Sequence, residues 1–346
     1  MKVALISTYT CATPPLTYGG ESYYWGLAKT LAEMGHEVHL FGKGGSQTPP
    51  GGYLHTISGT ENGAIYYKKE TWVYDHFKDL LLSCDIVHDC SLSKIVAERL
   101  RFIHDKQEIV NTINGHTYYM PRPPFNVVTG SKFWQEDAKA SGLNTEMIYW
   151  GIDTDFYTPG DEPREDYILW LSRFHPDKGL SQAMLLANYL GFELKVAGSM
   201  EFKDHRDYGK QYSDKIDQLP NIEIVRLPMD STHHIAKREL YRKAKAFLYP
   251  VQYQECFGMV VTEAMACGCP VMATPNGAMP ELIKHGESGW LCPRDGDFGK
   301  VLFSIQDGVP EEMREQARTQ ALQFSWQAAA EQYNDLYSKV VDGYGW

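Results

Sequence analysis

Residues 246–274 read "AFLYPVQYQECFGMVVTEAMACGCPVMAT", and this stretch decides the fold class of the chain. It opens and closes with short apolar runs. Between them, "VQYQECFGMVVTEAMACG" leads into a helix packed by Val260, Val261, Ala264, Met265 and Ala266. Apolar runs this short are typical of strands in a parallel sheet that is covered on both faces. The stretch therefore predicts a strand–helix–strand unit.

Glu255 and Glu263 lie eight positions apart in this unit. Eight helical steps make about 800°, so two helical residues at this spacing differ by about 80° around the axis. Glu255 precedes Phe257-Gly258 and is expected in the loop, whereas Glu263 is expected inside the apolar helix. A carboxylate there costs free energy unless it is hydrogen-bonded, and sugar and ribose hydroxyls are suitable partners. The alternative to two parts of one site is a pair of solvated helix charges.

The same alternation of apolar runs and helical patterns extends along the chain. Strands are expected at 2–7, 36–42, 84–90, 107–113 and 125–131, and again at 167–172, 192–198, 221–226, 245–250 and 269–274. Two successive βα arrays predict two doubly wound domains, residues 1–150 and 151–325. The Pro, Gly and acidic content of "GIDTDFYTPGDEPRED" (151–166) suits the linker between them. Ligands of such sheets bind outside the carboxyl ends of the strands, so the loops after the strands are the candidate sites.

Composition excludes several classes of protein. The 346 residues are 43% hydrophobic and 22% charged, which is typical of a globular protein. The net charge of −11 without a Lys/Arg block disfavours nucleic-acid binding. There is no apolar run of about 20 residues and no signal-peptide pattern. Seven cysteines without a CxxC pair indicate reduced thiols, so we expect a cytoplasmic protein.

Three loops after predicted strands hold candidate ligand-binding residues. Gly20 precedes a helix whose N-terminal amides can receive a phosphate, although a plain glycine turn is the alternative. A GxGxxG fingerprint is absent, so a nicotinamide site is not supported. His116 follows the strand at 107–113 and can donate hydrogen bonds or handle a proton, but most histidines are surface or packing residues. Arg173 and Lys178 flank a turn that opens a helix, where two cations are unfavourable unless an anion lies between them; we weigh a diphosphate above a solvated basic turn.

Taken together, these elements resemble the GT4 family of retaining glycosyltransferases, which have the GT-B fold. "ECFGMVVTEAMACGCPV" (255–271) is similar to the E-x7-E element of that family, and "LSRFHPDKG" (171–179) is similar to its diphosphate-binding segment. "TYGGESYYWGLAKTLAEMGHEV", "GIDTDFYTP" and "NGAMPELIKHGESGWLC" fit further family elements in the expected order. The chain departs from the family at Gly277-Ala278, where Gly-Gly is common, and in the base-binding region at 221–234. The resemblance covers nearly the whole chain.

The resemblance implies two Rossmann-like domains that face a central cleft, with the acceptor on the first and the nucleotide sugar on the second. The final helix, 326–346, is then expected to return to the first domain, and closure of the cleft to exclude water. The resemblance also implies that His116 lies near the anomeric centre and Glu255 contacts the sugar hydroxyls, both as catalytic residues. It implies that the diphosphate is bound by Arg173, Lys178 and, in the first domain, Gly20. The implied sugar and phosphate contacts come from Phe257, Gly258, Met259 and Val260, and the implied ribose contact comes from Glu263.

The implied activity is transfer of a hexosyl unit, with retention, from a UDP-, GDP- or ADP-hexose to an acceptor hydroxyl. No metal and no cofactor besides the donor are expected, because Arg173 and Lys178 would stabilise the departing diphosphate. The D-x-D at Asp153–Asp155 lies in the linker and is rejected as a metal site. The acidic charge favours a saccharide or small-molecule acceptor over a lipid-linked one. The alternatives are a nucleotide-sugar-binding protein without transfer activity and a GT-B epimerase that hydrolyses its donor.

Overall fold

The computed structural model describes residues 1–14, 19–57, 66–113, 125–198, 203–216, 219–228 and 232–346. The chain divides into two compact units: unit 1 comprises Met1–Ile152 and Ser325–Trp346, and unit 2 comprises Asp153–Phe324. The sequence-based expectation was a division after residues 150 and 325. Each unit is described by itself.

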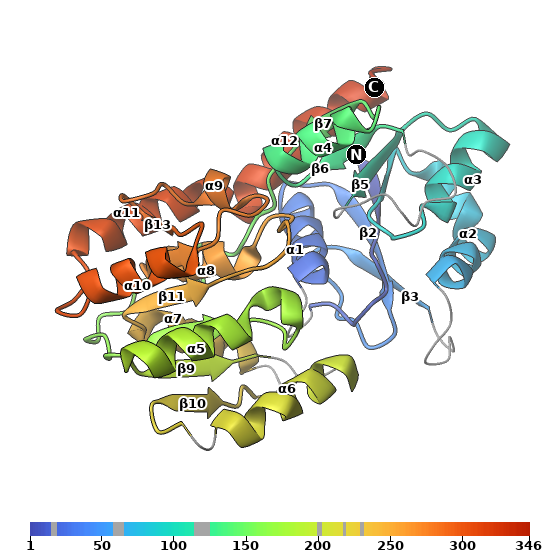
Figure 1. The fold of residues 1–346 in the computed structure, drawn as a ribbon. Coiled ribbons are helices and arrows are strands. Elements are labelled where there is room, and N and C mark those ends of the chain that lie inside the picture. The colour runs from blue at the N-terminus through green and yellow to red at the C-terminus, as the bar shows by residue number, and fades with distance from the viewer. Residues whose placement is uncertain (15–18, 58–65, 114–124, 199–202, 217–218, 229–231) are drawn as a thin grey trace. The chain divides into compact units, whose positions relative to one another are not determined.

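Unit 1 is a parallel sheet with helices between its strands (Figure 1). Its elements are β1 (Lys2–Ile6), α1 (Gly19–Glu33), β2 (Glu37–Lys43), β3 (Tyr53–Ile57), α2 (Tyr66–Ser83), β4 (Ile86–Asp89), α3 (Ile95–His104), β5 (Ile109–Ile113), β6 (Val127–Thr129), α4 (Lys132–Ala140), β7 (Thr145–Met147) and α12 (Trp326–Val341). Within the described ranges, the seven strands are ordered β3-β2-β1-β4-β5-β6-β7 and every neighbouring pair is parallel. The order reverses between β1 and β4, which makes that edge the topological switch point.

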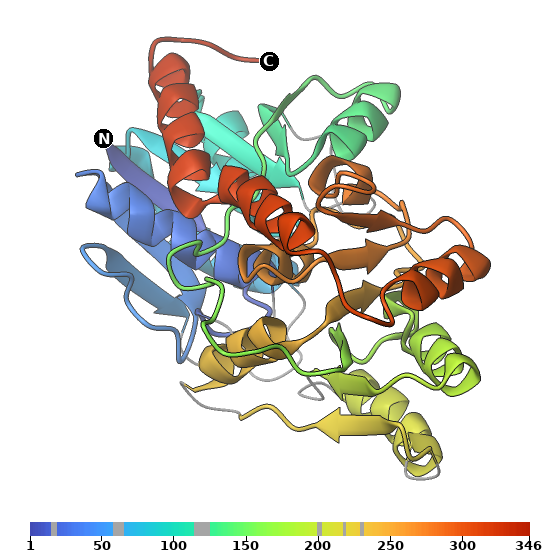
Figure 2. The same ribbon diagram turned by 90° about the vertical axis from the view of Figure 1, so that its left-hand side faces the viewer.

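The helix α12 belongs to unit 1 although it follows unit 2 in the chain (Figure 2). It begins at Ser325, whose side chain accepts the amide of Ala328 at 3.0 Å, as the sequence predicted for an N-cap. Gly26 on α1 lets the two helices approach, because a Cβ there would overlap the Trp326 ring. The Tyr337 hydroxyl lies 2.6 Å from Nδ1 of the buried His88. Unit 1 is therefore completed by a segment from the far end of the chain.

Unit 2 repeats the doubly wound arrangement. Its elements are β8 (Ile168–Leu171), η1 (Pro176–Lys178), α5 (Leu180–Leu190), β9 (Leu194–Ala197), α6 (Lys203–Ile216), β10 (Ile222–Val225), α7 (His233–Lys243), β11 (Ala246–Tyr249), α8 (Met259–Ala266), β12 (Val271–Ala273), α9 (Met279–Leu282), β13 (Gly289–Leu291), α10 (Asp295–Ser304), α11 (Glu311–Ala321) and η2 (Leu322–Phe324). For the part of unit 2 that is described, six parallel strands are ordered β10-β9-β8-β11-β12-β13. The switch point of this sheet lies between β8 and β11.

The prediction of two doubly wound parallel sheets is confirmed. All ten predicted strands coincide with observed ones, whereas β3, β7 and β13 were not among them. The central strands of both sheets are buried because helices cover their two faces; in unit 2 the core gathers around Trp170, Phe174 and Leu248. All seven cysteines are free thiols, and six of them are buried. Among the residues described, no helix has the length and apolarity that a membrane span requires.

Candidate functional site

Three loops of unit 2 join at the carboxyl edge of its sheet, at the switch point between β8 and β11. In the loop after β11, the amide of Gln252 donates to the carbonyl of Asp177, in the loop after β8, at 2.7 Å. From the loop after β12, the amide of Ala278 donates to the carbonyl of Glu255 at 3.0 Å. The three loops thus hold one another through their backbones, as the strand-end rule led us to expect for a ligand site.

Two glycines permit this close approach. Gly179 has φ +72°, and a Cβ there would overlap the carbonyl oxygen of Pro250. Gly277 has φ +61°, and a Cβ there would overlap the backbone of Glu255. Any other residue would carry a Cβ into these atoms and would also be strained by the positive φ. The loops that carry Lys178 and Glu255 are therefore positioned by glycines whose role is steric.

Lys178 and Glu255 form a buried ion pair with two tyrosines around it. The Lys178 Nζ donates to Glu255 Oε2 at 2.7 Å, to the Tyr249 hydroxyl at 2.8 Å and to the Tyr253 hydroxyl at 2.7 Å. Both tyrosines in turn donate to Glu255: Tyr249 to Oε2, and Tyr253 to Oε1 at 2.6 Å. The three N–H groups of the ammonium are all used by these three acceptors.

The electrostatics of this cluster lower the pKa of both members of the ion pair, which favours the charged form of Glu255 but not that of Lys178. Burial by itself raises the pKa of Glu255, but the charge of Lys178 and the bonds from Lys178 and both tyrosines outweigh it and lower the pKa below its usual value. Burial lowers the pKa of Lys178, and the nearby charge of Arg173 lowers it further, against the effect of Glu255. Arg173 is half-buried in the loop after β8. The structure thus brings Arg173, Lys178 and Glu255 near one another, and their contact with a donor stays a prediction.

Glu263 lies in a second and separate network. It is on α8 and 5% exposed, and its Oε1 accepts Lys237 Nζ of α7 at 2.9 Å while its Oε2 accepts the Tyr241 hydroxyl at 3.3 Å. We had expected ligand hydroxyls to compensate this buried carboxylate. The structure supplies a lysine and a tyrosine instead, because α7 packs against α8 and places Lys237 beside it. The ribose contact of Glu263 stays a prediction.

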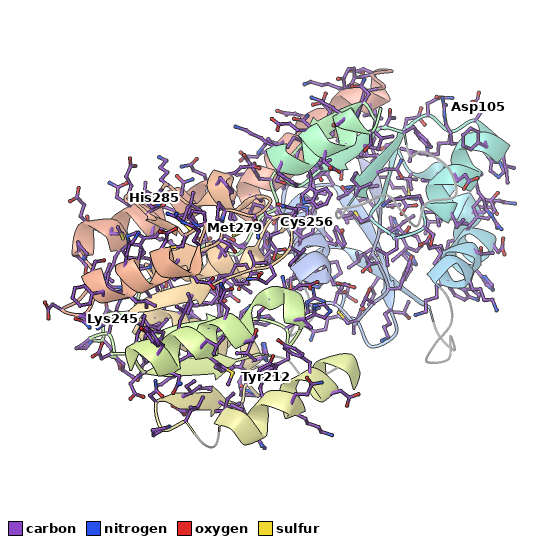
Figure 3. All side chains as sticks on the ribbon, viewed as in Figure 1. Asp105, Tyr212, Lys245, Cys256, Met279 and His285 are labelled. Atoms are coloured by element: carbon purple, nitrogen blue, oxygen red, sulfur yellow. The ribbon has the colours of Figure 1, made fainter. Side chains whose placement is uncertain are left out.

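The segment Phe257–Val260 forms the entrance to α8. Gly258 caps the helix with φ +97°, and a Cβ there would come within 2.5 Å of Met279 Cε. Figure 3 labels Met279, on α9, and Cys256, in the loop before α8. Phe257 is fully buried and packs edge-on against Phe324, with ring centroids 5.5 Å apart. Its ring therefore belongs to the core, so a ligand contact here falls to backbone amides of the first helical turn, where Met259 and Val260 lie.

The remaining predicted site residues lie elsewhere. Gly20 is in the first turn of α1 in unit 1, where a Cβ would meet only ordinary contact with Tyr24. His116 lies outside the described residues. Asp153 uses its carboxylate to accept the amide of Phe156 at 2.9 Å, which is the turn role of an aspartate. In the part of the chain that the structure describes, no three His, Cys, Asp or Glu side chains gather to hold a metal ion.

The sequence did not predict a role in these networks for Tyr249, Tyr253 or Lys237. Tyr253 lies two positions before Glu255, and Tyr249 ends the preceding strand, so both positions carried a weak signal that a polar aromatic lies at the strand edge. No sequence signal marked Lys237, because it lies 26 positions from Glu263 and contacts it only through the packing of two helices.

Comparison with known proteins relates these features to a family. Residues 153–320, nearly all of unit 2, match the family model "Glycosyl transferases group 1". A probable sucrose-phosphate synthase of Thermosipho melanesiensis is 28% identical over 204 residues, which cover 57% of this chain and 46% of that protein. A D-inositol 3-phosphate glycosyltransferase of Corynebacterium jeikeium is 39% identical over 105 residues, 29% of this chain and 25% of that protein. The matches thus span less than half of the length of these curated relatives.

The solved structures include one of Anabaena HepE in complex with UDP and glucose. It superposes with a TM-score of 0.76 at 17% identity, and the alignment covers 98% of this chain and 99% of that one. At this identity the likeness shows the fold alone, and it is the GT-B fold that the sequence predicted. The order of motifs, the two doubly wound sheets and the match of residues 153–320 to the glycosyl transferases group 1 all agree with a GT4-type glycosyltransferase.

Proposed function

We propose that this protein is a retaining glycosyltransferase that moves a hexosyl unit from a nucleoside diphosphate sugar to an acceptor hydroxyl, without a metal ion. The observation that carries the proposal is the buried Lys178–Glu255 pair at the switch point of the unit 2 sheet. A cation and a carboxylate on adjacent strand ends suit a donor that has a diphosphate at one end and a polyhydroxylated sugar at the other.

In the proposed reaction, the anomeric carbon exchanges its bond to the diphosphate oxygen for a bond to the acceptor oxygen. Lys178 and Arg173 hold the diphosphate and stabilise the charge that it gains. Glu255 positions the sugar through its hydroxyls and faces the positive charge that develops on the ring. The acceptor proton passes to the departing diphosphate, so the route needs no covalent intermediate. Gly20 at the diphosphate, His116 at the anomeric centre and Glu263 at the ribose keep the roles that the resemblance implies.

The relatives favour particular substrates. HepE was solved with UDP and glucose, which supports a UDP-hexose as the first donor to test, ahead of GDP- and ADP-hexoses. The names of the two curated relatives contain sucrose phosphate and inositol 3-phosphate. A small hydroxyl-bearing acceptor of that kind therefore ranks ahead of a lipid-linked one.

The first experiment is a thermal-shift screen with UDP-, GDP- and ADP-glucose in the presence of a chelator. We expect one of the three to raise the melting temperature by mass action. Lys178→Ala is expected to abolish that shift, and Glu255→Gln to keep binding but lower turnover by orders of magnitude. Lys300→Ala is the matched control, because Lys300 is a 77% exposed lysine of the same unit.

The products separate this function from its alternatives. A glycoside formed with retention supports the proposal. Binding of the donor without turnover across a panel of sugar and polyol acceptors points to a nucleotide-sugar-binding protein. Release of a free sugar with altered stereochemistry points to an epimerase that hydrolyses its donor. If none of the three nucleotide sugars stabilises the protein, or if both variants turn over at the wild-type rate, the proposal is wrong.

A further inference from the structure

We propose that Tyr253 is a positioning residue whose hydroxyl holds Glu255 in place for the sugar and yields its Lys178 N–H to the incoming diphosphate. The inference rests on the proposed function and adds a residue to it. The observation behind it is the hydrogen-bond geometry around the Lys178 ammonium group.

The first step concerns Lys178. Its three N–H groups go to Glu255, Tyr249 and Tyr253, so a phosphate oxygen can gain one of them only if an acceptor in the protein loses it. Giving up the bond to Glu255 would separate a buried ion pair, which is the costliest of the three exchanges. The choice therefore falls between the two tyrosines.

The second step distinguishes the tyrosines. Tyr249 ends β11, is fully buried and stacks on Phe247 with ring centroids 5.8 Å apart. Its hydroxyl also pairs with the Ser172 side chain, so it is held inside the protein by a second group. Tyr253 lies in the loop after β11 and is only half-buried. The N–H that bonds to Tyr253 is accordingly the one on the open side of the cluster, and it is the one that a diphosphate can take.

The third step concerns Glu255. Lys178 and Tyr249 both donate to Oε2, whereas Tyr253 donates to Oε1 at 2.6 Å. Donors on both oxygens fix the plane of the carboxylate, and Tyr253 keeps its own O–H on Oε1 when Lys178 turns to the phosphate. Its bond also contributes to the lowered pKa of Glu255. The Tyr253 hydroxyl thus holds Glu255 for the sugar through its O–H, and its oxygen releases a Lys178 N–H for the diphosphate.

The test is Tyr253→Phe, which removes the oxygen and keeps the ring. UDP is the binding probe, with GDP and ADP in parallel, and affinity is measured by calorimetry. Turnover is measured as release of nucleoside diphosphate from whichever of UDP-, GDP- or ADP-glucose stabilises the wild type most. We expect nucleoside diphosphate affinity to stay the same or rise, because a competing acceptor is gone, while kcat falls about 10- to 100-fold, the range for loss of one hydrogen bond to a charged group.

A second readout is the pH profile of kcat/KM. Loss of a hydrogen bond that favours the carboxylate raises the pKa of Glu255, so the acid limb moves to higher pH in Tyr253→Phe. Tyr167→Phe is the matched control: Tyr167 is a buried tyrosine of unit 2 whose hydroxyl donates to the carbonyl of Leu240 at 2.8 Å. It should lose a similar hydrogen bond without any change in kcat or in the pH profile.

Each outcome decides the matter. If the wild type binds none of the three nucleoside diphosphates, the proposed function fails and the role of Tyr253 falls with it. If the wild type binds and turns over, but Tyr253→Phe matches Tyr167→Phe in kcat and pH profile, the inference alone is overturned. It is also overturned if Tyr253→Phe loses nucleoside diphosphate affinity as Lys178→Ala does, because Tyr253 would then only support the lysine. Melting temperatures of all variants show that the folded protein is being compared.

Discussion

In the described part of unit 2, two lysine–glutamate pairs are buried, and the sequence predicted the setting of one of them but not of the other. Arg173, Lys178 and Glu255 were expected together because each follows a strand of one sheet, and strand ends of a doubly wound sheet converge. That Lys178 would pair with Glu255 itself was not predicted, since the two are 77 positions apart and nothing in the local pattern sets their distance. Lys237 and Glu263 meet through helix packing, which no periodicity reveals.

The second pair leads to a prediction about stability. Lys237→Met leaves the Glu263 carboxylate buried without its cation, so the free energy of unfolding should fall by about 3–5 kcal/mol. The double variant Lys237→Met/Glu263→Leu removes both charges and should recover most of that loss. Denaturant unfolding of the three proteins measures it. A loss below about 1 kcal/mol for Lys237→Met would show that the pair behaves like an exposed one, against its 10% and 7% side-chain exposure.

At the scale of elements, the sequence predicted the buried strands and missed three partly buried strands at sheet edges. The ten predicted strands are apolar runs whose residues are largely buried on both faces, and this burial is why their composition identifies them. The strands that were not predicted, β3, β7 and β13, all lie at sheet edges and are only partly buried, with Tyr53 of β3 55% exposed, so none shows a continuous apolar run. The sequence likewise did not show the role of Gly179 and Gly277, because these glycines act by lacking a Cβ and make no side-chain contact.

Gly179 and Gly191 provide a matched test of this steric role. They flank α5 with φ +72° and +73°, but a Cβ at Gly179 would overlap Pro250, whereas a Cβ at Gly191 would meet nothing within 4 Å. Both alanine variants carry the strain of a positive φ, about 1 kcal/mol. Gly179→Ala must also separate the loops after β8 and β11, and so should lose more stability and weaken nucleoside diphosphate binding.

The measurements for this pair are denaturant unfolding and calorimetric titration with UDP, GDP and ADP. Gly191→Ala should bind like the wild type. Equal stability losses for the two variants, together with unchanged binding in both, would show that the loops do not depend on contact at Gly179.

At the scale of the whole molecule, unit 2 is one continuous segment and unit 1 is not. The return of the final helix to the first domain came from the family resemblance and from no pattern in the chain. In the structure, α12 brings Tyr333 and Tyr337 onto unit 1, where their hydroxyls lie 3.1 Å from Thr112 Oγ1 and 2.6 Å from His88 Nδ1. Without α12, these polar groups of unit 1 and the apolar surface around them would be uncovered.

The discontinuity predicts how fragments of the chain behave. Residues 153–324 should fold alone, with a cooperative thermal transition, because they contain a complete sheet and core. Residues 1–152 should lack such a transition and gain it when a peptide of residues 325–346 is added. Circular dichroism and calorimetry measure both. A cooperative transition in residues 1–152 without the peptide would contradict the assignment of α12 to the core of unit 1.

The position of α12 also bears on the order of events during synthesis. Between the last residue of the first segment of unit 1, Ile152, and the end of α12 at Val341 lie roughly 190 residues, which a ribosome adds in about 10–40 s. During that interval unit 1 lacks α12, so His88 and Thr112 lack the tyrosine hydroxyls that pair with them. Unit 2, which is synthesised after residues 1–152, can complete its fold before unit 1 does. A chaperone that acts on this protein should therefore bind residues 1–152, which cannot complete their fold until α12 has left the ribosome.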